Sequence, residues 1–342
     1  MSVVFRWLRL FFSGIFFIAC LVAVFNYRTT LYLISQAKGQ LAVLTNTQSV
    51  KDSCFVNRLT PHQKENLQLV ERIKKYSVDE LGYLPTNNYT TVFVPTADQI
   101  LWVITSCEAF EFNAYQWSFP IVGKVSYKGF FRKELAEREY NHLVSMGYDV
   151  DLRSVSAWST LGWFKDPLIM NMLDRSKASL CNLLFHELFH STYYAPNSVN
   201  LNENLANFVA HKATLEFLKE DTAATRSYLY NQEDNNVFSR YMLMKKNYLA
   251  NYYKLIKNTN EKQNLKLKAL YTIVDSIQFL PLHNPKKFTG RGKEIIKFKN
   301  AYFIDFQQYE SLQDSLEIVF NKFYAGNLKI FIERLKLNKI NY

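Results

Sequence analysis

The segment from His186 to His190, which reads His-Glu-Leu-Phe-His, constrains the fold of this chain more than any other feature. Apolar residues precede it at 183–185 (LLF) and lie inside it at 188–189. This pattern predicts a buried helix from about residue 176 to 193. Residues four positions apart share one face of a helix, so both imidazoles can reach one metal ion. Buried imidazoles also need partners, which favours a metal site.

A third ligand is available 13 residues after His190. Glu203 begins a second helix, expected over 201–218, within the sequence Asn-Glu-Asn-Leu-Ala. The short intervening loop lets this helix pack back against the first. A catalytic zinc ion has three protein ligands and one open position. We therefore expect one Zn²⁺ per chain, held by His186, His190 and Glu203, with Asn207 one turn later as a hydrogen-bond partner of a ligand imidazole.

Glu187 follows the first ligand directly and is expected to face the open side of the zinc site. There it can act as the general base, taking a proton from the attacking water and passing it to the leaving amine. His211 and Glu216 are weaker rivals for the third ligand because they lie farther along the second helix. Tyr193 and Pro196 occupy the positions of Gly and His in the longer HExxHxxGxxH pattern, which excludes a metzincin arrangement.

The N-terminus contains an uncharged apolar run at 10–25, LFFSGIFFIACLVAVF, preceded by Arg6 and Arg9. With its flanks the run approaches the roughly 20 residues that span a bilayer. Positive charge on its N-terminal side places that end in the cytoplasm. We expect residues 1–27 to be an uncleaved single-pass anchor, with the rest of the chain extracytoplasmic, in the periplasm. The alternatives are a cleaved signal peptide and a lipoprotein signal that uses Cys20.

The formal net charge of +11 comes from lysines and arginines that are scattered along the chain. A nucleic-acid-binding protein usually concentrates such charge on one face, so we expect a solvated basic surface and no nucleic-acid partner. Attraction to anionic lipids is the next possibility. Cys54 and Cys107 could form a disulfide in an oxidising compartment.

The remaining pattern favours an α+β fold, with strands grouped early and helices grouped late. Thr60 and Pro61 begin a helix with a capping box, and Gly147 ends another helix at 132–146. Runs rich in β-branched and aromatic residues predict strands at 89–95, 100–106, 121–127 and 148–158. Helical character is expected at 28–55 and beyond residue 219, with a loop around 281–292. We expect one domain over 28–342, with its sheet within about 56–165 and its metal-binding, helical part over about 166–342.

Five blocks of the chain, at 32–44, 117–131, 156–167, 183–190 and 202–210, occur in an order and spacing that resemble a known family. This is the bacterial family of "putative aminopeptidases" with a gluzincin-type HExxH…NExxA zinc site. The resemblance implies a zincin-like metallopeptidase domain with a small antiparallel or mixed sheet and a mostly helical C-terminal half. It also implies a zinc peptidase with His186, His190 and Glu203 as ligands and Glu187 as base.

Zincins that the chain resembles use a strand upstream of the metal helix as an edge for an extended peptide. Here the natural candidate is 153–164, where the small residues Ser159, Thr160 and Gly162 would let a substrate approach; the alternative is an ordinary turn. An oxyanion stabiliser is also expected. Tyr228, Tyr230 and Tyr241 are candidates among 22 tyrosines, and the sequence does not distinguish between them.

Trp117, Phe119 and Tyr127 are expected to belong to the core. The Gly-x-Met-Glu-Asn motif of well-known zinc aminopeptidases is absent, so the sequence leaves exopeptidase and endopeptidase action open. The leading hypothesis is a membrane-anchored zinc peptidase that acts on peptide or protein substrates. The alternative hypothesis is a zinc-containing envelope protein with a binding or scaffolding role and little proteolytic activity.

Overall fold

The computed structural model describes residues 27–95, 101–119, 123–155, 165–196, 198–256, 261–304 and 312–337, together with Phe5, Trp7 and Phe306. Its α-helices are α2 (Tyr27–Thr45), α3 (Ser53–Asn57), α4 (Pro61–Asp79), α5 (Lys133–Ser145), α6 (Lys177–His190), α7 (Val199–Phe217), α8 (Thr222–Leu255), α9 (Lys262–Ser276), α10 (Pro285–Thr289), α11 (Gly292–Phe298), α12 (Asn300–Ile304), α13 (Gln313–Tyr324) and α14 (Leu328–Lys336). Its strands are β1 (Thr47–Ser49), β2 (Thr91–Phe93), β3 (Leu101–Cys107), β4 (Trp117–Phe119), β5 (Gly123–Val125), β6 (Tyr127–Phe130), β7 (Asp149–Val155) and β8 (Leu168–Ile169). Two short 3₁₀ helices cover Met170–Asp174 and Ile277–Phe279.

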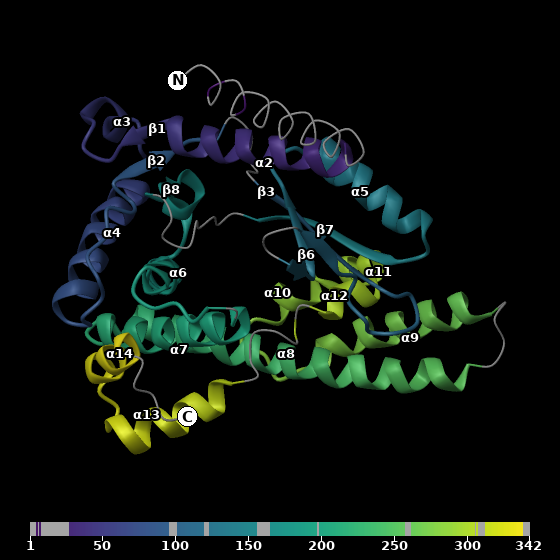
Figure 1. Cartoon of the computed structure of the whole chain (residues 1–342). Helices are drawn as coiled ribbons and strands as arrows, with labels where there is room; N and C mark the ends of the chain where they lie inside the picture. Colours follow the sequence, from purple (N-terminus) through teal and green to yellow (C-terminus); the bar gives the residue numbers. More distant parts are fainter. Residues whose placement is uncertain are drawn as a thin grey trace.

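The strands form three small sheets within a mostly helical chain, which confirms the α+β class but corrects the expectation of one sheet (Figure 1). One sheet has the order β1-β2-β8, with β2 antiparallel to β1 and parallel to β8. A second, antiparallel sheet has the order β6-β3-β7, and β4 and β5 form a hairpin. The strand β2 pairs with β1, which precedes it in the chain, and with β8, which follows it, whereas both partners of β3 lie downstream of it.

The helix α6 lies inside the largest core and contacts α4, α7 and α8 (Figure 1). Its side chains at Leu180, Leu184, Phe185 and Phe189 are completely buried. A helix that is apolar on most of its faces must be covered on most of its faces, and the neighbouring helices provide that cover. Residues on both sides of position 165 share this core, so packing crosses the boundary that we expected there.

The N-terminal end of α4 has the capping box that the sequence predicts. The Thr60 side chain accepts a hydrogen bond from the Gln63 amide at 3.2 Å, and the Gln63 side chain accepts one from the Thr60 amide at 3.0 Å. Gln63 also donates to Asp174 at 2.8 Å, in the segment just before α6. The cap therefore both begins α4 and fixes it beside the approach to α6.

A second core, formed mainly by α8, α9 and α11, is joined to the sheet β6-β3-β7 by a buried ion pair. The ammonium group of Lys266, on α9, lies 2.5 Å from the carboxylate of Asp149 at the start of β7. Asp149 also accepts the backbone amide of Asn300 at 2.9 Å, and the Asn300 side chain donates to the carbonyl groups of Glu108 and Ala109. The network thus ties α9, α12 and β7 together.

Several local predictions differ from the structure. The strand expected at 121–127 is two short strands, β5 and β6, and the loop expected at 281–292 contains the helix α10. Cys54 is exposed and Cys107 is buried, and both are free, so they do not form a disulfide. Trp117 is buried as expected, but the side chain of Tyr127 is 50% exposed.

The predicted N-terminal anchor lies outside the described residues, apart from Phe5, Trp7 and Tyr27. Among the helices that the structure describes, none has both the length and the apolar character needed to span a bilayer. The anchor and the periplasmic location therefore remain predictions.

We predict that replacing Lys266 by Met destabilises the fold. The side chain of Lys266 is completely buried, and its removal leaves the Asp149 carboxylate buried without its cation. Breaking one side of such a pair costs about 3–5 kcal/mol. Chemical denaturation, followed by circular dichroism, measures this loss.

The matched control is Lys268→Met, two residues away on the same helix and exposed to solvent. Its free energy of unfolding should change by no more than about 0.5 kcal/mol. Equal losses for the two variants would show that the buried pair does not hold α9 against β7.

Candidate metal centre

The structure brings His186, His190 and Glu203 together, and these are the three residues that the sequence predicts as metal ligands. Their potential ligand atoms all lie within 4.8 Å of one another. The two Nε2 atoms are 3.1 Å apart. The Glu203 carboxylate oxygens lie 3.4 Å from Nε2 of His186 and 3.5 Å from Nε2 of His190.

These separations fit a tetrahedral metal ion. With bonds of about 2.0–2.1 Å to nitrogen or oxygen, two ligands of a tetrahedral zinc lie about 3.3 Å apart. The distance between the two Nε2 atoms is within a few tenths of an ångström of that value. Each Nε2 also lies at such a distance from one carboxylate oxygen of Glu203, Oε2 for His186 and Oε1 for His190. Two imidazoles and one carboxylate are also a donor set that zinc accepts in catalytic sites. The residues present therefore fit a zinc ion.

Local structure explains why the three side chains meet. His186 and His190 are one helical turn apart near the C-terminal end of α6, with His190 only 5% exposed. The chain then reverses, and the Asn202 side chain holds the reversal by accepting from the Ala195 amide at 2.7 Å and donating to the Ala195 carbonyl at 2.8 Å. Glu203 follows directly and faces the two imidazoles from α7.

Charges within the cluster favour an ionised Glu203. Burial alone would raise the pKa of its carboxyl group, but the hydrogen bond with His186 and the charges of both imidazoles lower the pKa below its usual value. Burial and the charge of His186 lower the pKa of His190 to about 4. The site thus offers an anionic oxygen beside an imidazole that is neutral at neutral pH, which is the state that binds a metal ion.

The environment of His186 includes the predicted partner Asn207. Burial lowers the pKa of the imidazole, but hydrogen bonds with Glu203 and Asn207 and the charges of Glu187 and Glu203 outweigh burial and raise the pKa. Asn207 therefore lies where the sequence analysis expected a partner of a ligand imidazole. By contrast, Nδ1 of His190 is buried and has no hydrogen-bond partner among the described residues.

Glu187 is half-buried on α6, beside a tyrosine that the sequence analysis did not identify. Tyr89 is completely buried, and the pKa of its phenol is raised by burial and by the charges of Glu187 and Asp166. Its backbone has a φ of 62°, in the left-handed region that few side chains adopt. The sequence predicts this residue as the start of a strand, but β2 begins two residues later.

The rival ligands have other partners. His211 makes a hydrogen bond of 3.0 Å with the hydroxyl of Tyr228, and Glu216 accepts one of 2.9 Å from Tyr76. Neither belongs to the cluster of potential metal ligands in the described part of the chain.

The three tyrosines considered as oxyanion donors make contacts with residues other than the three ligands. Tyr228 contacts His211 and Asn182, Tyr241 donates to the carbonyl of Ile273 at 2.6 Å, and the ring of Tyr230 stacks on His283. None of these contacts brings the phenol to the ligand cluster.

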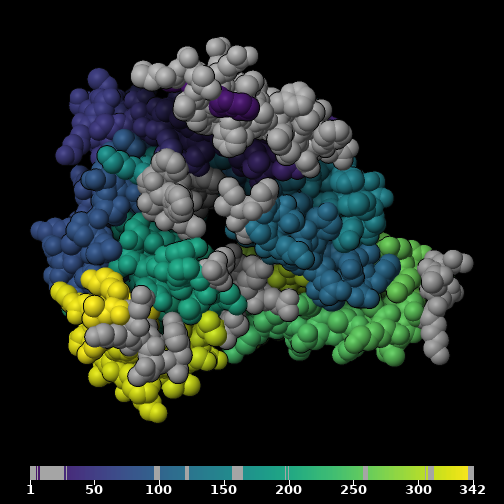
Figure 2. All heavy atoms as spheres, viewed as in Figure 1, coloured from purple at the N-terminus to yellow at the C-terminus, as the bar shows by residue number. Residues whose placement is uncertain are grey.

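Tyr127 is a tyrosine whose phenol is influenced by the charge of Glu203. Partial burial and then the charge of Glu203 raise the pKa of its phenol, which places the phenol within electrostatic reach of the ligand carboxylate. Tyr127 begins β6, in the sheet opposite α6 and α7. The molecular surface is indented between those helices, in teal, and the sheet, in blue (Figure 2). No pattern in the sequence distinguishes this tyrosine from the others.

The predicted substrate edge is described only in part. Arg153, Ser154 and Val155 form the end of β7, which is an edge strand of the sheet β6-β3-β7. Ser159, Thr160 and Gly162 lie outside the described residues.

Comparison with known proteins identifies the class of this chain. Its residues 31–340 match the family described as "Putative aminopeptidase". The match covers most of the chain, so the chain belongs to that family, and the family description points to a peptidase. No curated protein and no solved structure matches the chain, so the zincin-like fold remains a prediction.

We predict that Asn202→Ala weakens the metal centre without removing a ligand. The change leaves the amide and carbonyl of Ala195 without their partner, which costs about 1–3 kcal/mol of stability. Because the same reversal positions Glu203, zinc affinity should fall by about tenfold or more. Denaturation and competition with a zinc-binding dye measure the two effects.

Asn321→Ala is a suitable control because Asn321 is an exposed asparagine on α13, distant in sequence from the cluster. The role of the reversal would be refuted by unchanged zinc affinity in Asn202→Ala.

Proposed function

We propose that this protein is a zinc-dependent peptidase that hydrolyses peptide bonds of peptide or protein substrates. The observation that carries the proposal is the convergence of His186, His190 and Glu203 at separations that suit one zinc ion. The family description supports the peptidase activity. The proposal keeps the N-terminal segment as a membrane anchor and the remainder of the chain as extracytoplasmic.

In this mechanism the two imidazoles and the Glu203 carboxylate hold zinc, and Asn207 orients His186 through its hydrogen bond. Zinc, when bound, polarises the scissile carbonyl and makes an attacking water more acidic. Glu187 follows the first ligand on α6 and is half-buried, so its carboxylate can receive the proton of the attacking water. The same group then delivers that proton to the leaving amine as the peptide bond breaks.

The first prediction of this proposal concerns metal content. Purified protein should contain about one zinc per chain by elemental analysis, and Glu203→Gln should lower that content because it removes the anionic ligand. Free zinc at 100 times its Kd should stabilise the metal-free protein by about 2.7 kcal/mol. Folded protein that neither contains zinc nor gains stability from it would refute the zinc site.

The second prediction concerns hydrolysis. Glu187→Gln should retain zinc and fold normally, because Glu187 is not a ligand in this arrangement. Its turnover of a peptide substrate should fall about 10²- to 10⁴-fold because the general base is lost. A quenched fluorescent peptide library measures turnover, and mass spectrometry of the products identifies the cleaved bond.

His211→Gln provides the matched control for this measurement, since His211 is bonded to Tyr228 away from the cluster. Wild-type protein that binds zinc but cleaves no peptide in the library would favour the alternative role, a zinc-containing binding or scaffolding protein of the envelope.

A further inference from the structure

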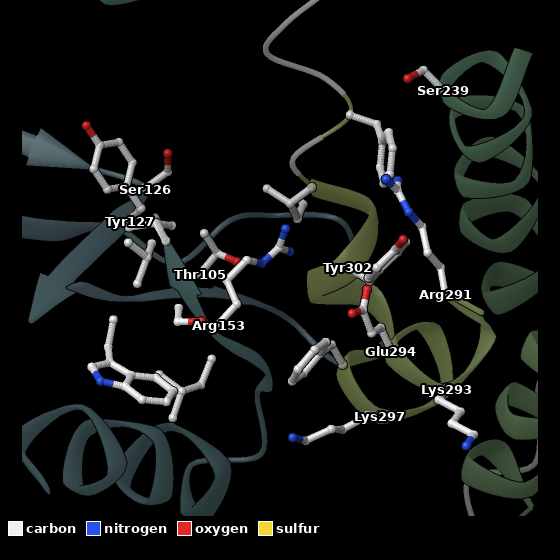
Figure 3. A pocket seen from close by; sticks show the side chains of 18 residues that line it. Thr105, Ser126, Tyr127, Arg153, Ser239, Arg291, Lys293, Glu294, Lys297 and Tyr302 are labelled. Atoms are coloured by element: carbon white, nitrogen blue, oxygen red, sulfur yellow. The ribbon is translucent and has the colours of Figure 1, made fainter. Parts of the chain in front are cut away.

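A large pocket lies between the sheet β6-β3-β7 and the helices α8, α11 and α12. It has a volume of about 1090 Å³. Figure 3 shows its polar lining, with Arg153 extending from the strands toward Arg291, Glu294 and Tyr302 on the helical side. This volume accommodates several residues of a peptide, since pockets for drug-sized ligands measure about 300–1,000 Å³.

The lining of the pocket is strongly basic. Arg153, Arg291, Lys293 and Lys297 are its cations, and Glu294 is its one carboxylate among the described residues. The buried Asp151 pairs with Arg153 and offsets one further charge. An excess of positive charge remains in the pocket, so an anionic group is favoured there.

Arg291 is held in place before any ligand arrives. Its guanidinium lies 5.2 Å from the centre of the Phe238 ring and 5.0 Å from that of Phe288. It also makes a hydrogen bond with the hydroxyl of Tyr302. A guanidinium stacked on aromatic rings retains donors for a carboxylate and loses little conformational freedom when it binds one.

The hydroxyl of Tyr302 is influenced by charges from both sides of the pocket, the strand side and the helix side. Burial raises the pKa of Tyr302 to about 12, and the charges of Arg291 and Arg153 oppose that shift while Glu294 adds to it. Charged residues from β7 and from α11 therefore both influence the phenol of Tyr302. Tyr302, Arg153 and Arg291 all line the pocket, so a carboxylate bound there would be attracted by both guanidinium groups (Figure 3).

Tyr127 links the pocket electrostatically to the candidate metal centre. This residue lines the pocket, and its phenol is within electrostatic reach of the ligand Glu203. The end of β7, which also lines the pocket, is the part of the predicted substrate edge that the structure describes. The pocket therefore includes the described end of the strand that is expected to bind an extended substrate.

We propose that the pocket binds a carboxylate of the peptide substrate, so that the protein selects substrates with an anionic group on one side of the cleaved bond. This inference rests on the proposed peptidase function. The carboxylate has two possible sources, the C-terminus of the peptide and an Asp or Glu side chain. Apolar walls at Trp102, Phe298 and Phe306 contact the remainder of the bound segment.

Binding of four matched peptides tests the proposal. They share one fluorescently labelled sequence and differ in two features: a Glu or a Gln at one position, and a free or an amidated C-terminus. Full-length Glu187→Gln protein prevents cleavage during the measurement, and fluorescence anisotropy gives each Kd. Loss of the recognised carboxylate should weaken binding about 10- to 100-fold, and the feature responsible identifies its source.

Pocket variants in the same background assign the effect to the pocket. Arg291→Gln should abolish the preference for the carboxylate, Arg291→Lys should retain part of it, and Lys297→Met should reduce it. Lys297 is exposed, so this variant tests the pocket even where Arg291→Gln unfolds. Lys268→Met, outside the pocket, should bind all four peptides like the parent. Equal Kd values for the four peptides, or a preference that survives Arg291→Gln and Lys297→Met, would overturn the proposal.

Failure of this inference is distinguishable from failure of the proposed function because binding requires no hydrolysis. Carboxylate-selective binding without cleavage by the wild type would retain the pocket and refute the peptidase. Cleavage by the wild type with no selectivity for a carboxylate would support the peptidase and refute the role of the pocket.

Discussion

The burial of α6 is the constraint on which the rest of the structure depends. Its side chains are apolar on most faces, so helices α4, α7 and α8 must cover it. The predicted ligands His186 and His190 lie on this same buried helix. Burying two imidazoles without polar partners would cost free energy of folding. The Glu203 carboxylate offsets that cost from α7, and a metal ion would offset it further. The same packing that stabilises the core therefore fixes the geometry of the site.

A second interaction, between Lys266 and Asp149, determines how the helical C-terminal half meets the sheet. Asp149 begins β7 and Arg153 lies four residues further along the same strand. Asn300 begins α12 and follows α11, which carries Arg291 just before it and Lys297 near its end. Because the buried pair joins β7 to α9 and α12, it also sets the distance between the cations on the two sides of the pocket. Phe298 and Tyr302 belong to the second core and also line the pocket, so the packing of this core and the shape of the pocket are connected.

The parts of the site that are local in sequence could be predicted, and the parts that depend on distant segments could not. The helical spacing of His186 and His190 and the short reversal to Glu203 are encoded within 18 residues, and the structure brings the three together. Tyr127, Arg153 and Arg291 are separated by long stretches of chain, and no periodic pattern relates them. Burial of Tyr127 was expected from its residue type alone, yet its position at the start of β6 exposes half of it. The division into three sheets was missed for the same reason, since β2 pairs with strands from both directions along the chain.

The distance between the two recognition points bears on the kind of cleavage. An extended peptide advances about 3.3–3.6 Å per residue, so a carboxylate held in the pocket fixes how many residues separate it from the bond at the metal centre. A C-terminal carboxylate in the pocket would give cleavage at a constant distance from the end of the substrate. A side-chain carboxylate would give cleavage at a constant distance from an acidic residue, wherever that residue lies in the chain. Tyr127 lines the pocket, and the charge of Glu203 contributes to the raised pKa of its phenol, so this residue is the described link between the two recognition points. The source of the carboxylate, a chain terminus or a side chain, then bears on the choice between an exopeptidase and an endopeptidase, which the HExxH motif leaves open.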